Sequence, residues 1–158
     1  DLGWRARIFG YRSYYVPQTI IHHHGSAHWK WSPQVFYLLE RNRWLVLLKN
    51  YSLSTLLKLW PSLIIIEFSM LGFFATKGLL LKKLKSYGSI LSLFGHIMKQ
   101  RKIIHNKRKI SDIEIIRSFC GTIKIPSEAN DSKLNNKFEK LLSSLCKFSG
   151  YDKIVREP

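Results

Sequence analysis

A nearly uncharged stretch in the middle of the chain constrains the fold more than any other feature. Between Lys58 and Lys77 the only charged residue is Glu67. A helix needs ~20 apolar residues to span a bilayer, and Pro61 and Glu67 interrupt this run, so it predicts a poor transmembrane helix. We expect amphipathic helices that lie in the membrane interface. A re-entrant hairpin and a buried helical pair in a soluble protein are the alternatives.

The residues after this run are strongly basic. A second, shorter apolar run covers residues 86–98, and the densest basic run follows it at 99–109, KQRKIIHNKRK. The chain has a net charge of +16 and a pI near 10.1, which indicates an anionic partner but does not choose among membranes, nucleic acids and phosphorylated substrates. Beside apolar helices, basic residues favour anionic lipid, at about 1 kcal/mol each. Without an aromatic stacking platform, this run does not predict a nucleic acid partner.

The cysteine content indicates a reducing compartment. Cys120 and Cys146 are too few and too far apart for a disulfide framework, and there is no CxxC metal-binding pair. The length of 158 residues is enough for one ordinary domain with a real core.

Several helices are predicted by their capping residues and apolar spacing. Gly10 would end a first helix, and Ser32 with Pro33 would start another. Ser52 or Ser54 would cap a short third helix, and Ser111 with Glu114 forms a capping box. The predicted helices are Leu2–Phe9, Pro33 to about Asn50, Tyr51–Leu59, a helix to about Phe119, and Asp131–Phe148.

Two short segments predict strands. Residues 11–16 are aromatic and β-branched and precede Pro17, and residues 19–23 form a second apolar run. We expect this brief pair to add to a larger sheet that lies upstream.

Histidines and arginines gather around the end of the second predicted strand. His22, His23 and His24 follow the apolar run, and the next helix carries Arg41 and Arg43. Imidazoles beside guanidiniums suit a metal-held, doubly charged phosphate ligand. The alternative is that the histidines end a surface strand and the arginines are a solvated helix face.

Three blocks in order, DLGWRARIFGYRSYYVP, HHHGSAH and FYLLERNRWLVLLKNYS, resemble the carboxyl-terminal part of the nucleotide-sugar domain of family 2 glycosyltransferases. These are inverting, GT-A type enzymes, and the resemblance is of the rhamnosyltransferase kind. It implies an α/β fragment whose short strands complete the edge of a GT-A domain. The implied division is residues 1–52 as the end of that domain, 53–119 as a helical membrane-associated region, and 120–158 as a linker and an amphipathic helix.

The resemblance also implies roles for individual residues. In the family, a Glu-Asp-x-Asp-Leu element carries the general base, and Asp1 matches its last Asp, so the base would lie two positions before Asp1. Asp1 itself would be a helix-start or second-shell carboxylate. Arg5 would pair with the acidic element, with core packing or a surface ion pair as the alternative. His23, with His24 as the alternative, would ligate a divalent metal, Mg or Mn, on the nucleotide-diphosphate sugar.

The function implied by the resemblance is sugar transfer to a lipid-linked or glycan acceptor at the cytoplasmic face of the cell membrane. Arg41 or Arg43 would hold phosphate or an anionic group of the acceptor. The chain would be the tail of a longer protein, held peripherally or monotopically, and inactive without the upstream half of the enzyme. The alternative is a non-enzymatic, basic peripheral-membrane or anion-binding protein.

Overall fold

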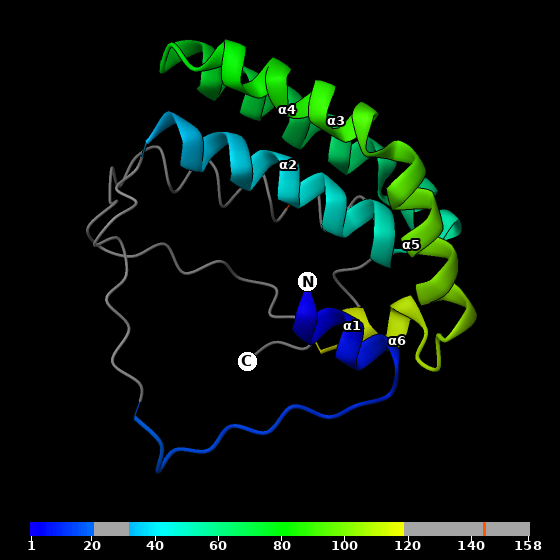
Figure 1. Cartoon of the computed structure of the whole chain (residues 1–158). Helices are drawn as coiled ribbons and strands as arrows, with labels where there is room; N and C mark the ends of the chain where they lie inside the picture. The colour runs from blue at the N-terminus through cyan, green and yellow to red at the C-terminus, as the bar shows by residue number, and fades with distance from the viewer. Residues whose placement is uncertain (21–31, 119–143, 145–158) are drawn as a thin grey trace.

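The computed structural model describes residues 1–20, 32–118 and 144, and this part of the chain is built from helices (Figure 1). In chain order they are α1 (Leu2–Ile8), α2 (Pro33–Asn50), α3 (Leu53–Thr76), α4 (Leu80–Ser92), α5 (Phe94–Asn106) and α6 (Asp112–Ile116).

The predicted α/β fold class is wrong for the described residues, which contain no strand. Residues 11–16, expected as a strand, are irregular and exposed, with Tyr15 88% accessible to solvent. A strand is stable only when its backbone pairs with a neighbour, and among the described residues this segment has none. Residues 21–23 of the second expected strand lie outside the described part.

Serine caps start three of the helices where the sequence predicted them. The hydroxyl groups of Ser32, Ser52 and Ser111 accept hydrogen bonds from backbone N–H groups in the first turns of α2, α3 and α6. Pro33 then occupies the first turn of α2, where its missing N–H is not needed. These helix starts are local properties of the sequence.

The expected break in the apolar run does not occur. Instead of a short helix at 51–59, α3 continues through Pro61 to Thr76. Proline removes one internal hydrogen bond, but the helix persists because its inner residues, including Ser62, Leu63 and Phe74, are buried against its neighbours. The prediction of a short helix at 51–59 is therefore wrong, because α3 is one helix from Leu53 to Thr76.

Two glycines end helices in the left-handed conformation. Gly10 (φ 87°) follows α1, and Gly78 (φ 66°) follows α3. At Gly78, the Leu79 N–H donates to the Phe74 carbonyl at 2.8 Å and the Gly78 N–H donates to the Ala75 carbonyl at 3.1 Å. This pair of bonds is a Schellman motif. It turns the chain so that α4 returns along α3.

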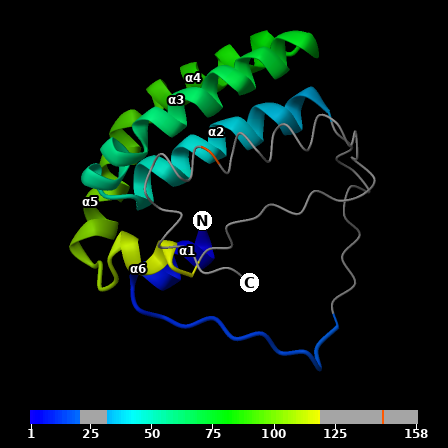
Figure 2. The same ribbon diagram turned by 180° about the vertical axis from the view of Figure 1, so that it is seen from behind.

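The helices form a layer above α2. Figures 1 and 2 both show α3 and α4 side by side on one face of α2, and α4 packs against both. The chain bends at Leu93, and α5 leads away from this layer to α6 and α1. The packing of α4 against both α2 and α3 decides which side chains form the interior.

Trp4 joins α1 to the rest of the molecule. One buried cluster contains Ile8, Ile104 and Ile115, and a second contains Tyr51 and Ile116. Trp4 packs against both, and its ring meets Tyr51 edge to face with centroids 4.6 Å apart. Trp4 is partly buried and links the two clusters.

Ser111 caps α6 as predicted, but the helix ends at Ile116, before Phe119. The helix expected at 131–148 lies outside the described residues apart from Ser144, which is helical. The proposed division at residues 52 and 119 stays a prediction.

Candidate functional site

The carboxylate of Asp1 is held by the carboxyl-terminal end of α2. The Lys49 Nζ atom donates to it at 2.9 Å and the Asn50 Nδ2 atom at 3.0 Å. The Arg5 Nε atom lies 3.4 Å away as an ion-pair partner without hydrogen-bond geometry. Asp1 precedes the first residue of α1 but its side chain does not cap that helix. The Asp1 side chain instead contacts Lys49, which lies 48 positions further along the chain.

Burial and the nearby Arg5 guanidinium lower the pKa of Lys49. Asn50 is fully buried, so its contact with Asp1 is partly shielded from water. Hydrogen bonds between charged or buried groups in such a site are stronger and more directional than at the surface. The geometry therefore fixes the amino-terminal end of α1 against α2.

A second carboxylate braces the turn between α2 and α3. Asp112 accepts hydrogen bonds from the Ser52 backbone N–H at 2.7 Å and from the Arg108 Nη1 atom at 2.6 Å. Arg108 also donates to the Asn50 carbonyl. Burial would raise the pKa of Asp112, but its hydrogen bonds with Ser52 outweigh this effect and hold the pKa below its usual range. The α2–α3 turn is thereby tied to the region around α6.

A cluster of buried charges joins α2, α3 and α4. The Lys83 Nζ atom from α4 contacts the Glu40 carboxylate and lies 2.6 Å from the Glu67 Oε1 atom. The Arg43 Nη2 atom lies 2.9 Å from Glu40 and 2.5 Å from Glu67. Lys83 is fully buried and Glu40 is 4% exposed. We call Glu40, Arg43, Glu67 and Lys83 the ion cluster, in which two cations balance two anions.

Two ring side chains complete the surroundings of Glu67. Trp44 donates from Nε1 at 3.2 Å and Tyr87 donates from its hydroxyl. Burial would raise the pKa of Glu67, but the hydrogen bonds from Lys83, Tyr87 and Arg43 hold it below its usual value. Burial and the Glu67 carboxylate raise the pKa of Tyr87 well above its ordinary range. The phenol therefore stays a donor at neutral pH.

The two arginines singled out in the sequence have different partners. Burial opposes the charge on Arg43, but Glu40 and Glu67 outweigh it and raise its pKa. Its charge is thus already neutralised by carboxylates of this chain. Arg41 donates to the Asn42 Oδ1 atom from Nε at 3.2 Å and from Nη2 at 3.0 Å, and lies over the Tyr37 ring at 5.6 Å. The phosphate role stays a prediction for both arginines.

The proposed metal ligands His23 and His24 lie outside the described residues. Within residues 1–20 and 32–118, no three His, Cys, Asp or Glu side chains are grouped so that they would hold a metal ion. The expected Mg or Mn site therefore rests on the resemblance alone.

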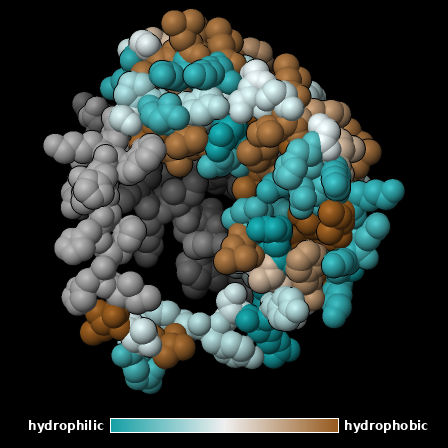
Figure 3. Space-filling model, viewed as in Figure 1, coloured by the Kyte–Doolittle hydropathy of each residue, from teal (hydrophilic) through white to brown (hydrophobic). Residues whose placement is uncertain are grey.

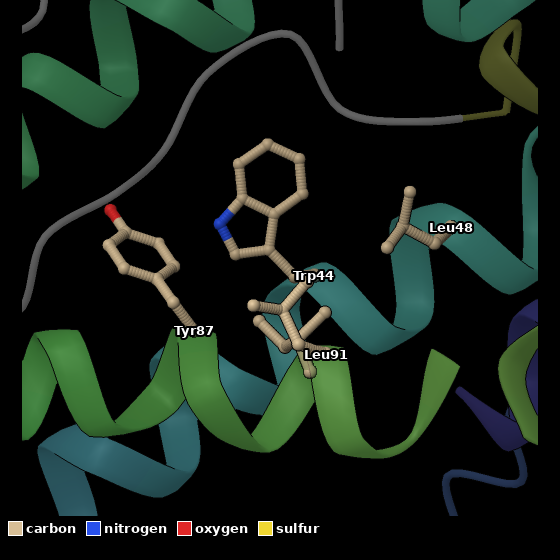
Figure 4. Close-up of a pocket in the computed structure, with 5 residues that line it drawn as sticks. Trp44, Leu48, Tyr87 and Leu91 are labelled. Atoms are coloured by element: carbon tan, nitrogen blue, oxygen red, sulfur yellow. The ribbon is translucent and has the colours of Figure 1, made fainter. Parts of the chain in front are cut away.

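A small apolar hollow opens beside the ion cluster. Its volume is about 240 Å³, and Trp44, Leu48, Tyr87, Ile90 and Leu91 line it. Figure 4 shows the indole of Trp44 rising from α2 between Tyr87 and Leu48, with Leu91 on α4 beside it. The lining carries no exposed polar surface, so the hollow suits hydrocarbon and does not suit a nucleotide.

The sequence reasoning missed the ion cluster. It treated Glu67 only as an interruption of the apolar run and assigned no role to Lys83. The signal that was available is Glu67 itself, because a lone carboxylate on an apolar helix needs a buried cation. The sequence alone did not indicate which cation would pair with it.

No family model matches the chain, and comparison with curated proteins and with solved structures finds no similar protein. By length and composition, α3 is long and apolar enough to associate with a membrane. Of its most apolar 18-residue window only 11% is buried, unlike the core helix of a soluble protein.

Proposed function

We propose that this chain is the carboxyl-terminal portion of a membrane-associated glycosyltransferase. The enzyme transfers a sugar from a nucleotide-diphosphate donor to a lipid-linked or glycan acceptor at the cytoplasmic face of the membrane. The upstream half of the protein is its partner and carries the general base. The proposal rests on the three blocks that resemble the family. The described part of this portion is helical and contains no strand.

The observation that carries the proposal is the contact between Asp1 and α2. Asp1 and Leu2 match the end of the acidic element of the family, and Lys49 and Asn50 lie near the end of the block that contains LLERNR. These two blocks meet through two hydrogen bonds to the Asp1 carboxylate. A rigid brace at this point would hold the preceding acidic residue in a fixed position relative to the helical layer. Such positioning is a requirement for general base catalysis.

In this scheme the residues of the described chain position and attach the enzyme. Asp1, Lys49 and Asn50 fix the element that bears the base, and α3 attaches the enzyme to the membrane. Arg41, which has no carboxylate partner among the described residues, contacts the phosphate or an anionic group of the acceptor, and His23 ligates the donor-bound metal. The metal would neutralise charge on the leaving diphosphate, and no further step is derived through it.

Sugar transfer in the parent protein tests this function. Purified protein that includes the residues before Asp1 is assayed in detergent with a panel of labelled nucleotide-diphosphate sugars and a lipid-phosphate or glycan acceptor. Transfer from one donor supports the proposal, and absence of transfer across the panel with folded protein contradicts it.

Lys49→Met tests the brace within the same assay. We expect kcat to fall by about tenfold with little change in donor KM, because removing one positioning contact misplaces the base without touching the donor. Lys49→Arg retains the charge and should recover most of the rate. Lys107→Met, at an exposed lysine directly after α5, is the matched control. Equal kcat for Lys49→Met and the control would remove the brace from the mechanism.

A second candidate is a non-enzymatic, basic peripheral-membrane protein. The ion pairs of Arg43 favour this candidate. Because Arg43 is paired with two carboxylates of the chain itself, it does not need a substrate phosphate to balance its charge. The donor panel separates the two candidates, because only the transferase consumes a nucleotide sugar.

A further inference from the structure

The outward face of α3 is apolar from Leu53 to Phe68. Large apolar side chains recur every three to five residues on the face turned away from α2 and α4, so they form one stripe along the helix. The stripe consists of Leu53, Leu57, Trp60, Ile65 and Phe68, of which Leu57 is 66% and Phe68 70% exposed.

A parallel stripe runs along α4 and into α5. It consists of Leu81, Leu84, Phe94 and Met98, with Leu81 80% and Leu84 51% exposed. The opposite side of α4 carries the buried Lys83 and Ser86, so this stripe also faces away from α2. Because α3 and α4 lie side by side (Figures 1 and 2), we call the two stripes together the apolar ridge. Figure 3 shows apolar residues over the upper part of the molecule, where α4 faces the viewer.

The ion cluster keeps charge away from the ridge. Glu67 is the one carboxylate of α3, and it turns inward to Lys83, Arg43 and Tyr87. Rotation of α3 to expose Glu67, or its separation from α4, would leave buried charges unpaired, which is strongly unfavourable. The ridge therefore keeps one orientation relative to α2. Since the ion cluster joins the centre of α3 to α2 and α4, α3 cannot slide along these helices.

Exposed lysines border the ridge. Lys58 lies near the start of α3 and Lys77 directly follows its end, while Lys99 and Lys102 lie on α5 beyond Met98. A symmetric dimer through the ridge would bring these cations of two copies together. An anionic lipid surface would instead satisfy both the apolar stripes and the lysines, in keeping with the net charge of +16.

We infer that the apolar ridge is a membrane-binding surface that lies in the plane of an anionic phospholipid interface. The inference rests on the membrane association in the proposed function and specifies the face and its orientation. Both stripes enter the region between head groups and acyl chains, and the bordering lysines contact lipid phosphates. In this arrangement α3 lies parallel to the membrane over its length of about 36 Å.

Vesicle binding by the full chain tests this surface. Sedimentation with vesicles of phosphatidylcholine and phosphatidylserine, compared with phosphatidylcholine alone, gives the partition coefficient. We expect Leu57→Glu/Phe68→Glu/Leu81→Glu to lower it by at least about tenfold, because three ridge side chains no longer enter the interface. The matched control is Tyr14→Glu/Leu39→Glu/Ile113→Glu, which adds the same charge at exposed apolar residues outside the ridge and should bind much more tightly than the ridge variant.

The orientation is tested by fluorescence quenching with brominated lipids. Phe68→Trp adds a tryptophan near the middle of α3. We expect bromine near the head group to quench the added signal more than bromine near the acyl end, because an in-plane helix stays shallow along its length. Stronger quenching by the deep bromine indicates a spanning helix and overturns the in-plane orientation.

Other outcomes are equally decisive. Failure of the wild-type chain to bind the anionic vesicles, or equal binding by the ridge and control variants, overturns the inference. Self-association through the ridge without vesicle binding would assign it to a second copy of the chain. In the parent protein, the ridge variant should still transfer sugar to a soluble acceptor in detergent. Loss of vesicle binding is therefore distinct from failure of the transferase proposal.

Discussion

At the scale of single residues, burial decides what a charged side chain does. Lys82 and Lys83 are neighbours of the same type, yet Lys82 is half-buried and Lys83 is fully enclosed between Glu40 and Glu67. Nothing local distinguishes them, because the carboxylates that enclose Lys83 come from two other helices. The ion cluster is thus a property of how α2, α3 and α4 pack.

Lys83→Met should destabilise the protein strongly. The change leaves two buried carboxylates with one cation between them, which costs about 3–5 kcal/mol of unfolding free energy. Denaturant unfolding followed by circular dichroism measures the loss. Lys82→Met, one position away and outside the cluster, should change the unfolding free energy by less than about 0.5 kcal/mol. Similar losses for the two variants would show that the cluster contributes nothing specific.

At the scale of elements, backbone chemistry determines where helices start and end. Gly78 takes a positive φ at the end of α3, whereas Gly72 lies within that helix. An added Cβ atom would meet no heavy atom within 4 Å at either position. The two glycines therefore differ in backbone conformation and not in available space.

Alanine at these two glycines should act in opposite directions. Gly78→Ala should lower the unfolding free energy by about 1 kcal/mol, because an L-residue is strained in the left-handed region. Gly72→Ala should raise it by about 0.5–1 kcal/mol, because alanine favours a helix interior. The same denaturant titration measures both. Stabilisation by Gly78→Ala would contradict the Schellman turn that returns α4 along α3.

At the scale of the whole molecule, α5 brings the amino-terminal helix and the α2–α3 turn together. His105 lies on α5 and forms a hydrogen bond with the backbone of Tyr51. Burial lowers the pKa of His105, and the positive charges of Arg101 and Arg108 lower it further. The Asp112 carboxylate and the hydrogen bond with Tyr51 act in the opposite direction but are outweighed. The His105 Nε2 atom is buried without a hydrogen-bond partner among the described residues.

Acidification should therefore destabilise the protein through His105. The unfolded chain binds a proton on this residue near pH 6.5, and the folded chain binds it only at lower pH, so stability falls as the pH drops below about 6.5. Unfolding free energies measured from pH 5 to 8 should show a smaller slope for His105→Gln. His96→Gln, at an exposed position of α5, should keep the wild-type slope. Because the pKa values of the Glu67 and Asp112 carboxyl groups are lowered, their protonation affects the unfolding free energy only at more acidic pH.

The sequence by itself determined the helix starts at Ser32, Ser52 and Ser111 and the helix end at Gly10, because caps and left-handed glycines act within a few residues. It also determined that an apolar segment adjoins a basic one. Tertiary structure alone decided that α3 runs unbroken through Pro61, that residues 11–16 form no strand, and that Glu40 and Glu67 enclose Lys83. Each of these depends on partners far away in sequence, and no local preference can supply a missing strand or select a distant cation.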